Sequence, residues 1–272
     1  MTIDLAPGHK VGLPVFNPIL LAAGTIGYGE VAPPGLVAKR LGGVVVGPIM
    51  RSSRRGADPP RLAEFPGGAV LAPGLQTRGV SNVLKRYARL WPRLGCPVIA
   101  QIGDTDPQSA AQTAERLSDC EDLAGLELRP SAAVDGSMLY RLVESIRQRS
   151  DLPVWVKLPW QSGRQLAAPA VDAGASALVV AQAPVGMGIR SPDSLRVRGE
   201  LVGPAICAQM LALLADVADL ALPCALIACG GIHTAAQVSA ALELGAQAVQ
   251  IDSAIWVEPG LPVKLADRFS TD

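Results

Sequence analysis

Short apolar runs recur along the whole chain and have the pattern of buried strands. Several are apolar at consecutive positions rather than at alternating ones, which is typical of strands covered on both faces. Val44–Val46 and Leu178–Val180 also show the β-branched bias of strands. The pattern predicts strands at Pro18–Ala23, Val44–Ile49, Pro97–Ile102, Ala124–Leu128, Pro153–Leu158, Ala177–Ala181, Ala225–Ala228 and Ala248–Ile251.

Segments with the spacing of amphipathic helices lie between the predicted strands. In Ser137–Arg149, for example, Leu139, Leu142 and Ile146 fall on one helical face. This face would pack against a sheet while the opposite face meets solvent. Further helices are predicted at Pro107–Leu117, Pro204–Leu220 and Thr234–Leu244.

The alternation of strands and helices defines the predicted fold class. It indicates an α/β protein and, with eight strands, a single (β/α)₈ barrel, the TIM-barrel fold. An open, doubly wound sheet is the alternative. No linker divides the chain, so residues 1–272 are expected to form one domain, with an irregular stretch at Arg51–Pro73.

Composition narrows the class of protein further. The chain has 272 residues, 49% of them hydrophobic and 18% charged, which suits one large core and excludes a disordered protein. Lys and Arg total 24, as do Asp and Glu, so no basic field favours nucleic acid or an anionic membrane. A small-molecule ligand is the expected partner.

Cysteine usage and the first residues indicate the compartment. The five cysteines include no CxxC and no Cys/His spacing, so neither a disulfide framework nor a metal site is expected. The start, MTIDLAPGHK, has no apolar signal segment, and no apolar stretch is long enough to span a membrane. A cytoplasmic protein is the expectation.

Charged residues stand at the ends of two neighbouring predicted strands, where barrels of this kind do their chemistry. Lys157 ends the fifth strand and is a candidate for holding an anion or a developing negative charge; a surface side chain is the alternative. Arg129 ends the fourth strand and is a candidate for binding a carboxylate or phosphate; a structural ion pair is the alternative. Glu127 is expected to point into the barrel and to need Lys157 or Arg129 as a partner.

Paired glycines follow the seventh strand. Gly230 and Gly231 precede a predicted helix, an arrangement that lets backbone N–H groups approach a phosphate; a plain tight turn is the alternative. The loops after strands seven and eight are the usual phosphate site of such barrels, so this loop and Ser253–Ala254 are expected to lie side by side. His233, at the start of the helix, and His9, in an early turn, form no catalytic triad or metal triad by spacing.

Several motifs together resemble the class 1 dihydroorotate dehydrogenases, over nearly the whole chain. The first strand and its loop, Asn17–Glu30, carry the family's AAGT and GYG pattern. The other matching motifs, in the family's order, are Pro60-Arg61, Pro66-Gly67-Gly68, Gly74-Leu75-Gln76, Lys157, Gly203-Pro204-Ala205 and Gly230-Gly231-Ile232.

The resemblance implies an FMN-binding barrel in which a base removes a proton while hydride passes to the flavin. It implies that Lys157 stabilises the reduced flavin, that some members form homodimers, and that some pair with an iron–sulfur flavoprotein subunit for electron transfer. By the same resemblance, FMN would be contacted by Ala22, Ala23, Gly24, Gln101, Lys157, Gly203, Gly230, Gly231, Ser253 and Ala254.

This chain departs from the family pattern at the catalytic face. Ala132 stands at the position of the base, so Ser131 beside it is the remaining candidate. Gly47 and Leu71 replace a family Lys and a substrate-binding Asn, and Asp252 replaces a phosphate-loop Gly. Ordinary dihydroorotate oxidation is therefore expected to be absent or very slow.

Three functions are compatible with the sequence. The first is an FMN-dependent oxidoreductase of the dihydroorotate dehydrogenase type, with a weak form of that reaction or with another substrate. The second is a catalytically silent paralogue that serves as a binding or assembly subunit. The third is a barrel enzyme for another phosphorylated ligand, with Arg129 and Lys157 as anion clamps.

Overall fold

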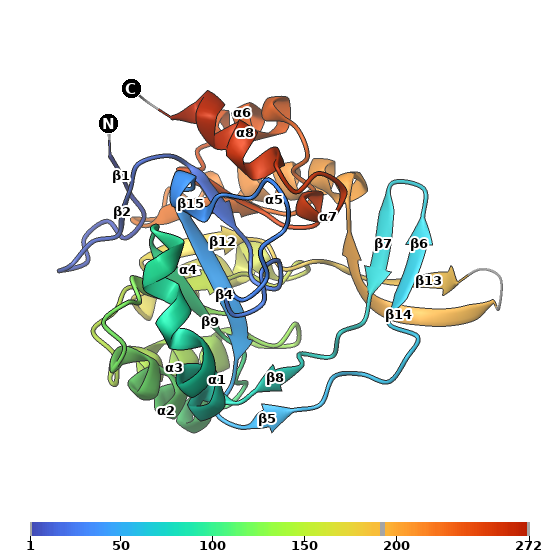
Figure 1. The fold of residues 1–272 in the computed structure, drawn as a ribbon. Helices are drawn as coiled ribbons and strands as arrows, with labels where there is room; N and C mark the ends of the chain where they lie inside the picture. Colours follow the sequence, from blue (N-terminus) through green and yellow to red (C-terminus); the bar gives the residue numbers. More distant parts are fainter. Residues whose placement is uncertain (1, 191–193, 271–272) are drawn as a thin grey trace.

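Eight parallel strands close into one barrel in the order β10-β11-β12-β15-β16-β3-β4-β9. Figure 1 shows helices packed around the barrel. This computed structural model describes residues 2–190 and 194–270. The prediction of a (β/α)₈ barrel is confirmed, and the open-sheet alternative is wrong. The barrel strands are β3 (Ile19–Leu21), β4 (Gly43–Ile49), β9 (Val98–Ile102), β10 (Gly125–Leu128), β11 (Val154–Lys157), β12 (Ala177–Val180), β15 (Ala225–Cys229) and β16 (Ala248–Ile251).

The strands are apolar on both faces because each face has its own core. Residues such as Leu20, Ile99 and Trp155 pack together inside the barrel, whereas their neighbours along each strand pack against the helices. A short N-terminal hairpin of β1 (Ile3–Asp4) and β2 (Pro14–Val15) covers the inner core at the amino ends of the strands. Trp155 Nε1 donates a hydrogen bond to the carbonyl of Leu5 at 3.0 Å, so the barrel is closed at this end.

Helices follow most strands, and side-chain caps fix where several begin. Asp106, Asp135 and Thr234 each accept a backbone N–H bond at a helix start. After β3 the expected helix is reduced to a 3₁₀ turn, η1 (Ala38–Arg40). The other helical elements are α1 (Val80–Tyr87), η2 (Ala88–Leu94), α2 (Pro107–Ser118), α3 (Gly136–Arg147), α4 (Gly163–Asp172), η3 (Pro204–Ile206), α5 (Cys207–Ala218), α6 (Ala235–Glu243), α7 (Ala254–Val257) and α8 (Leu261–Phe269). Among the described residues no helix has the length and apolarity needed to cross a membrane.

A second, antiparallel sheet stands beside the barrel mouth and was not predicted (Figure 1). We call it the flanking sheet; its order is β13-β14-β7-β6, and a separate two-stranded ribbon pairs β5 with β8. The prediction that Arg51–Pro73 is irregular was therefore wrong, because this stretch contains three strands. Besides β1 and β2, the strands outside the barrel are β5 (Ser53–Arg54), β6 (Leu62–Phe65), β7 (Gly68–Leu71), β8 (Thr77–Arg78), β13 (Val185–Arg190) and β14 (Leu195–Val202).

Candidate active site

A cavity of about 820 Å³ opens at the carboxyl ends of the barrel strands. Every barrel strand contributes to its wall, either with its last residues or with the loop that follows. The flanking sheet adds Leu71, Glu200 and Val202, so the cavity lies between the barrel mouth and this sheet. The contributions from the eight strands, in chain order, include Ala22, Gly47, Gln101, Arg129, Lys157, Ala181, Cys229 and Asp252.

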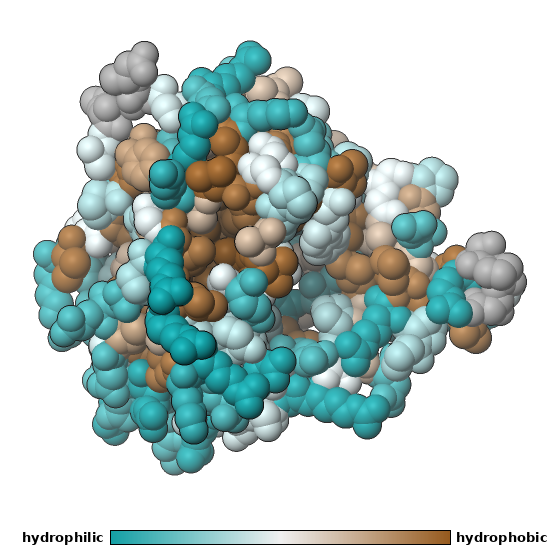
Figure 2. Space-filling view, in the orientation of Figure 1, coloured by the Kyte–Doolittle hydropathy of each residue, from teal (hydrophilic) through white to brown (hydrophobic). Residues whose placement is uncertain are grey.

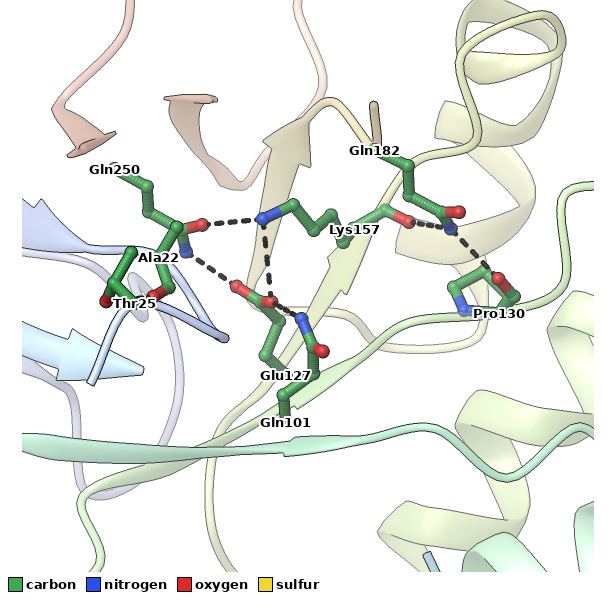
Figure 3. A network of polar contacts seen from close by, with 8 residues as sticks. All are labelled: Ala22, Thr25, Gln101, Glu127, Pro130, Lys157, Gln182 and Gln250. Carbon is green, nitrogen blue, oxygen red and sulfur yellow. Dashed lines mark hydrogen bonds and ion pairs between the residues drawn. The ribbon is translucent and has the colours of Figure 1, made fainter. Parts of the chain in front are cut away.

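A buried network of polar side chains forms the floor of this cavity (Figure 3). Lys157 Nζ donates to Gln250 Oε1 at 2.9 Å and lies 3.9 Å from Glu127 Oε1. Gln101 and Gln250 each donate an amide N–H to one Glu127 oxygen at 2.6 Å. Glu127 is fully buried and Lys157 is 7% exposed. The expectation that Glu127 points inward and meets Lys157 is confirmed.

Lys157 keeps its positive charge in this setting. Burial alone would lower its pKa, but its contact with the Cys229 sulfur and the carboxylates of Glu127 and Asp252 outweigh burial and hold the pKa above its ordinary value. Burial raises the pKa of the Cys229 thiol to about 11, so this side chain stays protonated at neutral pH. The floor therefore presents one ammonium group and one thiol to the cavity.

Arg129 forms a structural ion pair, the alternative that the sequence left open. Its Nη2 group contacts Glu200 Oε1 on β14, and the two side chains are 16% and 35% exposed. The pair joins the end of β10 to the flanking sheet. The guanidinium lines the cavity, but the carboxylate of Glu200 already balances its charge.

The loop after β10 holds no acid–base group against the cavity. Ser131 and Ala132 are exposed, and neither lines the cavity wall. Ser131 Oγ accepts the backbone N–H of Ala133 at 3.3 Å. Gln182 holds this loop against β11, because its amide donates to the carbonyls of Pro130 at 2.9 Å and Lys157 at 3.0 Å.

The loops after β15 and β16 lie side by side, since His233 Nε2 is 3.5 Å from Ser253 Oγ. Gly230 lines the cavity, whereas Gly231, Ser253 and Ala254 do not. A Cβ atom at Gly231, where φ is +69°, would lie 2.7 Å from the Cys207 nitrogen. Close packing against the start of α5 therefore requires a glycine there, independently of any phosphate.

Asp252 is the charged group at this end of the cavity. It lines the wall next to Gly230, and Ser253 Oγ donates to its Oδ1 at 3.2 Å. No Lys, Arg or His forms an ion pair with it in residues 2–190 and 194–270. A dianionic phosphate beside Gly230 would meet a carboxylate.

We expect the free energy of unfolding to fall as the pH drops below the ordinary histidine pKa of 6.5, in part through His233. Burial lowers the pKa of His233, and the nearby Asp252 opposes this effect only partly. A depressed pKa in the folded state adds stability above 6.5 that is lost as the pH falls through the folded value. In urea unfolding at stepped pH, His233→Gln should flatten this slope relative to the unsubstituted protein, because glutamine does not titrate. An unchanged slope in this variant would contradict the prediction.

The structure brings most of the predicted ligand-contacting residues into one cavity. Ala22, Ala23, Gly24, Gln101, Arg129, Lys157 and Gly230 all line it. Ser131, Gly203, Gly231, Ser253 and Ala254 do not. Gly203, with φ at +112°, approaches the turn between β6 and β7, where a Cβ atom would lie 2.5 Å from Gly68 Cα.

Sequence reasoning missed several wall residues from the segment that runs from β7 through α1, from β14 and from α7. These are Leu75, Arg78, Arg86, Glu200 and Trp256. In this part of the wall, the basic run at Arg51–Arg55, which supplies Arg54 and Arg55, is the feature visible in the sequence. Among the described residues, no cluster of three or more His, Cys, Asp or Glu side chains is arranged to hold a metal ion.

Comparisons with known proteins define the family. The dihydroorotate dehydrogenase family profile matches residues 9–270, and the chain belongs to this family. It is 36% identical to the "Dihydroorotate dehydrogenase B (NAD(+)), catalytic subunit" of Solidesulfovibrio magneticus, over 95% of this chain and 90% of that protein. The subunit of the same name from Desulforudis audaxviator is 33% identical, over 94% and 88%. The crystal structure of DHODH from Eimeria tenella with ferulenol shares the fold, at a TM-score of 0.80, 20% identity, and coverage of 98% and 82%.

Proposed function

We propose that this chain is a flavin-binding oxidoreductase of the dihydroorotate dehydrogenase family that does not turn over dihydroorotate at an ordinary rate. The observation that supports it best is Lys157, a charged ammonium held by Gln250 and Glu127 in the cavity floor. With one N–H given to Gln250, the ammonium has donors left for a ligand. Such a group stabilises negative charge that develops on a ring above it.

The residues present fit the ring of a flavin. A Cβ atom at Gly24 would meet nothing within 4 Å, so there is open space above this loop. Thr25 Oγ1 donates to the carbonyl of Ala22 at 2.7 Å and holds the loop in place (Figure 3). Gln101, part of the floor network, also lines the cavity. A bound flavin would supply the hydride-accepting chemistry that these side chains lack.

The phosphate of FMN fits less well than its ring, because Asp252 faces the end of the cavity where the family resemblance puts it. We therefore propose FMN as the cofactor, with weaker binding than the family pattern implies. Riboflavin has the same ring and no phosphate, so it is the informative comparison.

The cavity lacks the groups that dihydroorotate oxidation requires. A general base must lie within about 2.6–3.2 Å of the proton it removes, directly or through one water. Ala132 has no such group, and Ser131 does not line the cavity. Loss of a base typically lowers the rate by about 10²–10⁴. Gly47 and Leu71 in turn offer no polar side chain to a pyrimidine.

The test is flavin reduction without oxygen. Purified protein, reconstituted with FMN and separately with riboflavin, should show the visible absorption of an oxidised flavin. Dithionite should bleach it, whereas dihydroorotate should not within the time a family enzyme needs for many turnovers. Rapid bleaching by dihydroorotate would overturn the proposal about the substrate.

The second candidate is the catalytically silent binding subunit. It is favoured by the exposed Ser131–Ala133 loop, which carries no acid–base group to the cavity. Protein that quenches neither FMN nor riboflavin fluorescence would overturn flavin binding and support this candidate. The relatives are named catalytic subunits, so a partner subunit is proposed in either case.

A further inference from the structure

We propose an anion-binding subsite at the rim of the cavity, formed by Arg54, Arg78, Asn82 and Arg86. It would take the carboxylate or phosphate end of a ligand whose body lies in the cavity. That the ligand is the substrate of the flavin rests on the proposed function. The binding of an anion by these residues does not.

Three of the four residues are close in the chain. Arg78 ends β8, and Asn82 and Arg86 lie four residues apart on α1. Residues four apart along a helix are neighbours on the same face. Asn82 Nδ2 donates to the backbone carbonyl of Arg78 at 3.1 Å, which ties the start of α1 to the end of β8. All three line the cavity.

Arg54 approaches from the neighbouring strand. In the β5–β8 ribbon Ser53 pairs with Arg78, and Arg54 pairs with Thr77. Arg54 also lines the cavity, so β5, β8 and α1 each contribute one arginine to its wall. In Figure 2 the surface over this part of the molecule is largely hydrophilic.

The charges of these arginines are not balanced within the protein. Across residues 2–190 and 194–270, Arg54, Arg78 and Arg86 form no ion pair. Other arginines of the cavity are paired: Arg55 with Asp58 and Arg129 with Glu200. A planar guanidinium binds carboxylate and phosphate oxygens with two parallel hydrogen bonds.

The cavity is thus polarised. Asp252 makes the end beside β15 and β16 unfavourable for an anion, whereas the rim beside β5 and β8 attracts one. Between them the wall includes Pro48, Leu71 and Leu75, which carry no polar side-chain group, and the floor presents the Lys157 ammonium. The carboxylate of Glu30 also lines the cavity, where it accepts the backbone N–H of Tyr28. The chemistry favours a ligand whose anionic group lies at the β5 and β8 end.

The experiment measures anion binding to flavin-free protein by calorimetry and thermal shift. Inorganic phosphate and benzoate are the probes, at constant ionic strength set with chloride. Both are expected to bind, with the double variant Arg78→Gln/Arg86→Gln weakening the affinity at least about tenfold, which corresponds to about 1.4 kcal/mol. Arg93→Gln/Arg116→Gln removes the same charge from exposed positions outside the cavity and should leave affinity unchanged.

The outcomes are distinguishable. No binding of either probe, or equal losses in the two double variants, overturns the subsite. Tighter binding of benzoate assigns a carboxylate end to the ligand, and tighter binding of phosphate assigns a phosphate end. If the protein binds these anions but binds neither FMN nor riboflavin, the subsite is supported and only the proposed function is overturned.

Discussion

Replacing Asp252 by glycine is expected to raise the affinity for FMN at least about tenfold and to leave the affinity for riboflavin unchanged. Two unit charges about 4 Å apart interact by about 4 kcal/mol at an effective dielectric constant of about 20. A tenfold change needs only about 1.4 kcal/mol. Even partly screened repulsion between Asp252 and a phosphate is enough to produce it.

Fluorescence titration with the two flavins measures this effect. Asp252→Asn should give most of the increase in FMN affinity, because it removes the charge of the side chain and keeps its size. Asp219→Asn, a change outside the cavity, serves as the matched control. If riboflavin gained as much affinity as FMN, the cause would be space rather than charge, and the assignment of the phosphate to this end would be wrong.

Lys157→Met is expected to lower the free energy of unfolding by about 3–5 kcal/mol, the usual cost of breaking a buried ion pair at one partner. The variant leaves the fully buried Glu127 carboxylate with two amide donors and no cation. Adding Glu127→Gln should recover most of the loss, because the double variant holds no buried charge at this place. Urea unfolding followed by circular dichroism gives the four free energies of the cycle.

The matched control is Lys10→Met at a surface pair. Lys10 and Asp151 are 63% and 88% exposed, and exposed pairs contribute about 0–1 kcal/mol. A loss in Lys157→Met no larger than in Lys10→Met would show that the floor network is solvated. Lys157 would then be a poor candidate for stabilising charge on a ligand.

The barrel was predictable because its strands are buried on both faces. Consecutive apolar residues such as Val154, Trp155 and Val156 occupy the inner and outer cores in turn, and this pattern is visible without any partner strand. The first charged residue after such a run, Lys157, therefore marks the barrel mouth. Arg129 was located in the same way, at the end of the fourth predicted strand, whereas Asp252 was noted as a departure from the family pattern.

The flanking sheet and the partners that it supplies could not be predicted in the same way. Its strands bury few apolar residues, and several positions are glycines, so no periodic signal stands out. Glu200 reaches Arg129 only because β14 pairs with β7, a segment more distant in sequence. The arginines at the rim likewise depend on where β8 and α1 lie relative to the mouth.

The flanking sheet is held by pairings between segments far apart in the chain, such as Val202 with Ala69. Its own core consists of Ala63, Val70 and Val197, with a few half-buried neighbours, whereas the barrel strands share far larger cores. Local unfolding requires least free energy where few apolar side chains are buried. Backbone amides of this sheet should therefore exchange with deuterium sooner than those of the barrel, so this wall of the cavity is expected to open while the barrel stays folded.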